Sequence, residues 1–109
     1  MIFETHAHFE DDKYNEDREE ELARVFEAGV SYLVNVASSM ETSKQCMELA
    51  KTHAPIYASV GVHPDHVEEL DEAALAQLAA WCREDKVVAL GEIGLDYYYE
   101  DPVRSIQQK

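Results

Sequence analysis

Two histidines near the start of the sequence, His6 and His8, have the spacing that most directly suggests chemistry. Residues two positions apart in an extended strand point to the same side of it, so both imidazoles can reach one ion. Imidazole nitrogen is a good ligand for Zn²⁺, Mn²⁺, Fe²⁺ and Ni²⁺. The spacing therefore predicts part of a metal site that still needs a carboxylate. The alternative is that a His-x-His pair has arisen by chance.

Glu92 is the candidate carboxylate, because it interrupts the apolar run Val87–Ile93. A carboxylate that is buried, charged and unpaired is costly, so its presence in such a run calls for a reason. Ligation of a metal by Glu92, together with His6 and His8, is one reason. A salt bridge at the end of a strand is the other, and the residues alone leave both open.

His63 stands before Pro64 in the segment GVHPDH, and the proline favours an extended conformation for it. We expect His63 to contact substrate rather than to bind metal, although it could equally cap the next element or bond a backbone carbonyl. Asp65 and His66 are expected to be solvated loop residues. His53 lies at the end of a predicted helix, where a cation complements the helix dipole, and a structural role is expected for it.

Further polar and aromatic side chains follow the fourth apolar run. Asp96 either orients a ligand or forms a loop turn. The tyrosines 97–99 either stack on a base or form a packed aromatic lid. Trp81 falls beside the apolar stripe of a predicted helix and is expected to pack there. The sequence contains neither a nucleophilic Ser-His-Asp or Cys-His arrangement nor a glycine-rich phosphate loop.

Four short apolar runs are expected to form the strands that position these residues, at 1–5, 30–37, 56–62 and 87–93. Amphipathic helical segments separate them, which is the pattern of a parallel sheet buried on both faces in an α/β fold of four βα units. The histidines 6, 8 and 63, together with Glu92 and Asp96, fall at the carboxyl ends of these runs, where α/β proteins place their chemistry. The acidic stretch from Glu10 to Glu21 is expected to be a polar loop that runs into the first helix.

The predicted helices carry signals at their ends. Gly29 stands where a glycine ends the first helix, Ser38 and Glu41 form a capping-box pair, and Asp71 is a good N-cap. The apolar faces are expected to contain Cys46, Met47 and Ala50 in the second helix, and Leu75, Leu78, Ala79 and Cys82 in the third.

Length and charge restrict the class of protein. The 109 residues make one domain, 1–109, with a net charge of −14. Such an acidic chain repels polyanions, although a bound metal can attract a phosphate locally. The sequence shows no membrane-length apolar run and no secretory signal, so a cytoplasmic location is expected. Cys46 and Cys82 are expected to be reduced and buried.

Four segments resemble one family. They are ETHAHFED (4–11), NVASSMETS (35–43), YASVGVHPDH (57–66) and ALGEIGLDYYYED (89–101). In this order and spacing they are similar to the TatD-type metal-dependent hydrolases.

The resemblance implies a TIM-like (β/α)₈ barrel of the amidohydrolase type that binds one or two divalent metal ions, with Zn²⁺, Mg²⁺, Mn²⁺ and Ni²⁺ all open. It implies hydrolysis of phosphodiester bonds, with DNA as the usual substrate. It places His6, His8 and Glu92 at the metal, with Glu92 also catalytic, and His63 in the substrate pocket.

Two departures from the family pattern stand out. Glu4 occupies a position where the family usually has aspartate, which is expected to shift a supporting contact only. The family's other ligands, two histidines and a late aspartate, come from later strands, and a (β/α)₈ barrel takes about 250 residues. We therefore expect the chain to be the N-terminal half of such a barrel, ending inside the fourth helix and with little nuclease activity alone.

Exposed sheet edges in half a barrel are expected to lead to homo-oligomers. One alternative is therefore a non-catalytic module that acts by self-association. Another is a metal-dependent hydrolase of a different substrate class, such as a phosphoesterase or a deaminase.

Overall fold

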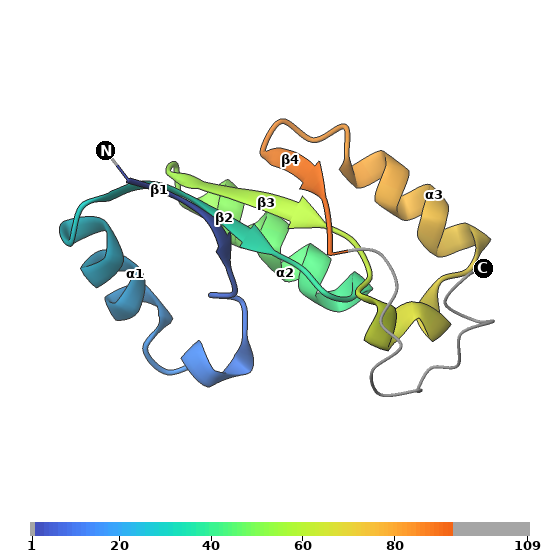
Figure 1. Cartoon of the computed structure of the whole chain (residues 1–109), viewed down its shortest axis with the longest axis horizontal. Helices are drawn as coiled ribbons and strands as arrows, with labels where there is room; N and C mark the ends of the chain where they lie inside the picture. The colour runs from blue at the N-terminus through green and yellow to red at the C-terminus, as the bar shows by residue number, and fades with distance from the viewer. Residues whose placement is uncertain (1, 93–109) are drawn as a thin grey trace.

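Four parallel strands form one sheet in a computed structural model that describes residues 2–92. The strands are β1 (Ile2–Ala7), β2 (Val30–Val36), β3 (Ile56–Val60) and β4 (Val87–Leu90). The helices are α1 (Arg18–Glu27), α2 (Met40–Thr52) and α3 (Glu72–Trp81), with short 3₁₀ turns at η1 (Asp12–Tyr14) and η2 (Pro64–Glu69). Figure 1 follows the chain through these elements.

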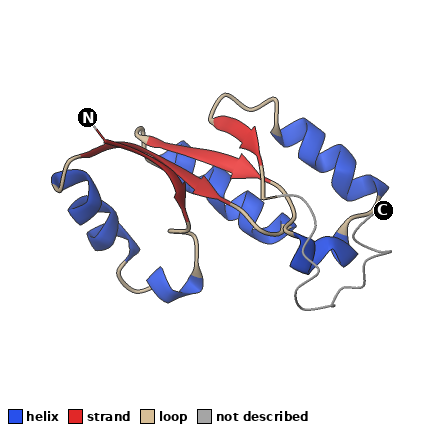
Figure 2. Ribbon diagram, in the orientation of Figure 1, coloured by secondary structure: helices blue, strands red, loops and turns tan. Residues whose placement is uncertain are grey.

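The order of the strands in the sheet is the order of the chain, β1-β2-β3-β4, and every neighbouring pair is parallel. A helix connects each strand to the next, as parallel strands require. The predicted α/β fold of successive parallel βα units is therefore confirmed. The carboxyl ends of all four strands lie at the same edge of the sheet (Figure 2), and this edge carries the candidate site.

The core lies between α2 and the two central strands. Cys46 and Ala50 of α2 pack among Leu33, Ile56 and Val60, which are all fully buried. Burying one such aliphatic side chain stabilises a fold by about 1.5–3 kcal/mol. The β-branched and aliphatic run of β3 and the helical stripe of α2 therefore anchor the sheet, as their periodicity predicts.

The outer strands depart from the prediction of a sheet that is buried on both faces. Ile2 and Phe3 of β1 are 54% and 52% exposed, and Val88 and Leu90 of β4 are 54% and 51% exposed. Within residues 2–92 each of these strands has a neighbouring strand on one side only. Burial on both faces holds for most of β2 and β3, because these strands have two neighbours and a covering helix.

Asp71 is the N-cap of α3, as predicted. Its side chain accepts a hydrogen bond from the Ala74 backbone N–H at 2.7 Å. Gly29 also follows the end of α1 as predicted, with a positive φ of 116° that favours glycine.

The capping box of α2 is one residue later than predicted. It joins Ser39 and Thr42 rather than Ser38 and Glu41. The Thr42 hydroxyl accepts the backbone N–H groups of both Ser38 and Ser39, at 3.0 and 2.9 Å, so a threonine at the third helical position replaces the expected glutamate.

Helix α3 buries a different face from the one predicted. Ala74 and Leu78 are buried, whereas Leu75 is 56% exposed. Cys82 is exposed instead of buried, because it forms the C-cap of α3 and lies past its packed face. Trp81 packs against the core as expected. Among the helices that the structure describes, none has the length and apolar character needed to cross a membrane.

Candidate metal centre

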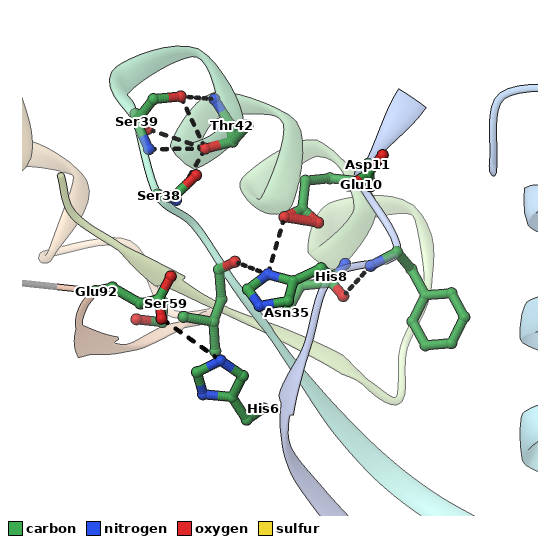
Figure 3. Close-up of polar contacts among 12 residues, drawn as sticks. His6, His8, Glu10, Asp11, Asn35, Ser38, Ser39, Thr42, Ser59 and Glu92 are labelled. Carbon is green, nitrogen blue, oxygen red and sulfur yellow. Dashed lines mark hydrogen bonds and ion pairs between the residues drawn. The ribbon is translucent and has the colours of Figure 1, made fainter. Parts of the chain in front are cut away.

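His6 and His8 lie at the carboxyl end of β1, as the prediction of a strand-borne pair requires. The strand is longer than expected and includes His6, while His8 follows its last residue. The two rings are on the same side, with centroids 4.9 Å apart and an edge-to-face arrangement (Figure 3). Both side chains are open to solvent, 56% exposed for His6 and 41% for His8, so an ion from solution can reach them.

Glu92 brings a carboxylate to the same place from beyond β4. Its Oε1 is 3.6 Å from His6 Nε2, and one ligand atom of each of His6, His8 and Glu92 lies within 4.8 Å of the others. The fourth strand ends at Leu90 rather than at the predicted Ile93. Glu92 therefore lies beyond the strand, at the carboxyl end of the sheet. The structure therefore gathers the three predicted ligands, and their binding of an ion stays a prediction.

Three hydrogen bonds hold the backbone of the Glu92 segment. The Glu92 N–H donates to Ala37 O and the Gly91 N–H donates to Val60 O, both at 2.8 Å. The Ser59 hydroxyl donates to Gly91 O, also at 2.8 Å. These bonds tie the end of β4 to the ends of β2 and β3, so the carboxylate is placed by the sheet itself.

Gly61 makes this close approach of the chain segments possible. A Cβ atom at Gly61 would lie 2.8 Å from the carbonyl carbon of Gly91 and 2.9 Å from Glu92 O. Real Cβ atoms do not approach backbone atoms so closely. A glycine at this position therefore allows the Glu92 segment to lie against the end of β3.

His8 is held through its Nδ1 atom, which lies 2.7 Å from the Val36 carbonyl oxygen. A carbonyl oxygen only accepts hydrogen bonds, so Nδ1 carries the hydrogen in this contact. The lone pair is then on Nε2, which is the form of imidazole that binds metal. The buried Asn35 side chain supports the turn after His8 by accepting the Phe9 N–H at 3.1 Å.

Glu10 is a functional candidate that the sequence analysis missed, because the acidic stretch was expected to be a polar loop that runs into the first helix. Its side chain is only 4% exposed, and its Oε1 is 3.5 Å from His8 Nδ1. Burial raises the pKa of the Glu10 carboxyl above its ordinary value. The position of Glu10 two residues after His8 is the one local signal that could have identified it.

Arg18 fixes the loop that carries Glu10. Its guanidinium donates to the backbone carbonyls of Phe9, Glu10 and Asp11 at 2.6, 3.3 and 3.1 Å, and to Asn15 Oδ1 at 2.9 Å. A planar guanidinium with several donors suits this role. The first residue of α1 thus organises the turn between the histidine pair and the helix.

A cavity of about 400 Å³ opens beside the three gathered side chains. Its charged lining is acidic apart from the imidazole of His8, and consists of Glu10, Asp11, Asp12, Glu41 and Glu92. These carboxylates attract cations and repel phosphates that arrive without a metal ion.

The other predicted residues that the structure describes are not members of this group. His63 follows β3, is half-buried, and donates its backbone N–H to Ser38 O at 2.8 Å, so its contact with substrate stays a prediction. His66 is exposed, as expected. His53 is the C-cap of α2, and its Nε2 lies 2.9 Å from Glu19 Oε2, in agreement with a structural role. Asp96 and the tyrosines 97–99 lie outside the described residues.

The donor set fits a catalytic metal ion. Two imidazoles and one carboxylate match the three protein ligands typical of catalytic zinc sites, which keep further positions open for water and substrate. The second nitrogen of His8 is already bonded to a carbonyl, which is the usual outer contact of a metal-binding histidine.

Several proteins are similar to this chain in sequence. The uncharacterized metal-dependent hydrolases YjjV of Escherichia coli K12 and YabD of Bacillus subtilis 168 are 38% and 35% identical over 109 residues, which are 98% and 100% of this chain. The 3'-5' ssDNA/RNA exonuclease TatD of Cronobacter turicensis is 31% identical over 96 residues, 88% of this chain. The chain spans 42%, 43% and 36% of the lengths of these relatives.

Two crystal structures match the fold. YjjV of Escherichia coli K12 superposes with a TM-score of 0.85 at 38% identity, and a TatD-family hydrolase of Entamoeba histolytica with 0.84 at 28% identity. Each match covers 98% of this chain and 42% of the other protein. The model of the TatD-related DNase family matches residues 3–109, and the chain therefore belongs to this family.

Proposed function

We propose that His6, His8 and Glu92 hold a divalent metal ion and that the site they form hydrolyses phosphodiester bonds of DNA. The observation that carries the proposal is the gathering of these three side chains within 4.8 Å at the carboxyl edge of a parallel sheet. Relatives that are named metal-dependent hydrolases and ssDNA/RNA exonuclease support the reaction class. Because the chain spans less than half of these relatives, the activity is proposed for the site as part of the whole protein.

The chain's own residues have distinct tasks in this proposal. When bound, a divalent ion supplies a Lewis acid and lowers the pKa of a coordinated water. His6 and His8 offer neutral nitrogen donors, and Glu92 offers the negative charge that offsets part of the ion's charge. The Glu92 carboxylate is catalytic in this sense, since it contacts the ion. His63 is proposed to contact the substrate, since it follows the neighbouring strand.

The acidic cavity makes the ion a condition for substrate binding. The net charge of −14 and the carboxylates of the cavity repel a phosphodiester from the empty site. A bound divalent ion is the largest local charge and reverses this repulsion. We therefore expect DNA binding to depend on metal loading. One or two divalent ions are proposed, and Zn²⁺, Mg²⁺, Mn²⁺ and Ni²⁺ all stay open.

The test is elemental analysis of the purified chain after metal loading and dialysis. We expect bound metal in the parent and none in a His6→Ala/His8→Ala variant. His66→Ala is the matched control, because it removes an exposed imidazole outside the gathered group. Equal metal content in the parent and the double variant would contradict the proposed site.

A nuclease assay on single-stranded DNA then addresses the reaction. Turnover by the metal-loaded parent well above that of a Glu92→Ala variant would place the activity in the chain itself. We expect little turnover from the 109 residues alone. Among the described residues, the group within 4.8 Å consists of the three proposed ligands only, so it holds no further carboxylate that could accept a proton. DNA cleavage that persists unchanged in Glu92→Ala would contradict the role of this carboxylate.

A second proposal is self-association through the outer strands. It rests on the exposed apolar side chains of β1 and β4, namely Ile2, Phe3, Val88 and Leu90. The outer edge of a sheet offers unpaired backbone groups to another strand, and exposed apolar surface favours association. A non-catalytic module would act through this surface and would not need the metal ligands, so metal analysis separates the two proposals.

A further inference from the structure

Among the residues whose burial the structure describes, Glu10 is the one charged residue in the buried set. The other buried polar residues are Asn35, Ser43 and Ser59. A buried carboxylate is costly unless it is paired, and within this part of the chain the Oε2 atom of Glu10 has no hydrogen-bond partner. The buried Cys46 thiol also interacts with this carboxylate. The charged or polar partner of the other oxygen, Oε1, is His8.

That other oxygen faces His8. Glu10 Oε1 lies 3.5 Å from His8 Nδ1, and the same nitrogen lies 2.7 Å from Val36 O (Figure 3). Nδ1 therefore meets two oxygen acceptors. A ring with its lone pair on Nδ1 would face both of them without a hydrogen to donate, which is unfavourable. The surroundings select the ring form with the hydrogen on Nδ1 and the lone pair on Nε2.

The backbone keeps Glu10 in place for this contact. Arg18 donates to the carbonyls on both sides of Glu10, those of Phe9 and Asp11, and to that of Glu10 itself. Because Arg18 begins α1, the contact between Glu10 and His8 is tied to a regular element rather than to a free loop. The carboxylate is thus fixed on the side of His8 that bonds Val36.

We propose that Glu10 is a positioning residue for His8, which holds the imidazole with Nδ1–H toward Glu10 and Val36 and leaves Nε2 to the metal ion. This inference rests on the proposed metal site. A carboxylate that accepts the second N–H of a ligating histidine fixes its ring and raises its basicity, and loss of such a partner typically costs 10–100-fold in metal affinity. Glu10 does not itself bind the ion in this proposal.

The first test needs only the unmodified, metal-free chain. The ¹⁵N chemical shifts of the His8 ring distinguish a nitrogen that carries hydrogen from one that carries a lone pair. We expect hydrogen on Nδ1 and a lone pair on Nε2. The opposite assignment would overturn the proposal, whatever the chain does with metal.

The second test is the affinity for Zn²⁺, measured by competition with a chelator. We expect Glu10→Gln to weaken binding by roughly 10–100-fold. Glu16→Gln is the matched control, because it makes the same change of side chain in the same loop, at an exposed residue outside the cavity lining. We expect it to change affinity less than about twofold, since charges exposed to water are largely screened.

Glu10→Asp separates the contact from the charge. It keeps the carboxylate but moves it away from His8 Nδ1 by one methylene. We therefore expect a Zn²⁺ affinity between that of the parent and that of Glu10→Gln. Affinity of Glu10→Gln within twofold of the parent, or an equal loss in Glu16→Gln, would overturn the proposal. If Glu10→Gln does not fold, the Zn²⁺ affinity of Glu10→Asp and the ¹⁵N chemical shifts of the parent His8 ring still test the proposal.

Failure of the proposed function has a different signature. A chain that takes up no Zn²⁺ contradicts the metal site, while the ¹⁵N assignment of His8 still shows whether Glu10 and Val36 select its ring form. If the chain binds Zn²⁺ through His6 and His8 and substitution of Glu10 leaves the affinity unchanged, the proposed function stands and the role of Glu10 is contradicted.

Discussion

The Glu92 carboxylate and the His6 imidazole approach to 3.6 Å, although one residue follows the last strand of the sheet and the other lies in the first. The sheet brings them together, because backbone hydrogen bonds tie Gly91 to Val60 of β3 and Glu92 to Ala37, which directly follows β2. The pair is partly open to solvent, so the contact itself stabilises the fold little. Its geometry matters for what can bind between the two side chains.

Removal of the Glu92 charge is expected to abolish tight metal binding. Glu92→Gln keeps the shape of the side chain but replaces a charged ligand with a weak neutral one. We expect Zn²⁺ affinity to fall by more than about 100-fold, which exceeds the effect of losing an outer contact. A chelator competition assay measures this, with Glu41→Gln, another residue of the cavity wall, as control. A similar loss in both variants would contradict a specific role for Glu92.

Gly61→Ala is expected to displace the Glu92 segment. The new Cβ would lie 2.8 Å from the Gly91 carbonyl carbon, so the backbone at 91–92 must move. We expect the free energy of unfolding to fall by about 1–3 kcal/mol, as for overpacked cores, and Zn²⁺ binding to weaken.

Gly29→Ala is the control for this change. It strains a backbone with φ 116° at the end of α1 and also lowers stability. Its new Cβ would meet Ile2 and none of the proposed metal ligands. Urea denaturation and metal titration on both variants separate the effects. Loss of metal affinity in Gly29→Ala alone would refute the steric argument.

The two cysteines are expected to differ in reactivity. Burial raises the pKa of the Cys46 thiol, and Cys82 is exposed. Because the thiolate is the reactive form, a thiol reagent should label one cysteine in the native chain and two in urea. Cys82→Ser should abolish the native reaction. Rapid labelling of Cys46 in the folded variant would show that the core between α2 and the sheet opens readily.

Glu10 is expected to make the metal-free chain less stable as pH rises. Its folded-state pKa lies above its ordinary value of 4.5, chiefly through burial, so the folded chain holds the proton more tightly than the unfolded chain does. This group therefore favours folding at pH below 4.5, and the advantage is lost as pH rises through the folded-state pKa.

Glu10→Gln removes this dependence. Relative to the parent, the variant should gain stability as pH increases from about 4 to 8, a range that brackets the ordinary glutamate pKa. Thermal or urea unfolding in the presence of a chelator measures the difference. A stability gap between parent and variant that is constant with pH would show that burial does not hold the proton on Glu10.

Self-association is expected to depend on the outer strands. Light scattering after gel filtration should give a mass above that of a 12.4 kDa monomer at high concentration. Val88→Lys places a charge on exposed β4 and should shift the chain toward the monomer, because edge lysines oppose strand pairing. Lys51→Glu on the exposed end of α2 controls for a change of surface charge. A monomer at every concentration would contradict this proposal.

The sequence predicted those features that depend on local periodicity. The parallel pairing of the strands and the meeting of His6, His8 and Glu92 at their carboxyl ends follow from alternating β and α segments and from the two-residue repeat of a strand. The sequential strand order is what the resemblance to a barrel family implies. Asp71 was recognisable as a cap because its partner, the Ala74 N–H, is three residues away.

Features that depend on distant partners were not predictable in this way. Glu10 is buried because Arg18 holds its loop and His8 lies against it, and none of this is visible in a run of acidic residues. Cys82 and Leu75 have apolar neighbours at helical spacing, yet their exposure depends on where α3 meets the rest of the molecule. Local pattern determines which residues form an element, and tertiary contact determines which of its faces is covered.

The identity of strand order and chain order has a consequence for synthesis on the ribosome. Each strand emerges next to a partner that already exists, because β2 pairs with β1, β3 with β2 and β4 with β3. The sheet can thus grow by addition at one edge as the chain lengthens, without waiting for a distant segment. The proposed metal ligands mark the two ends of this process, since His6 and His8 are made first and Glu92 joins them when the fourth strand docks.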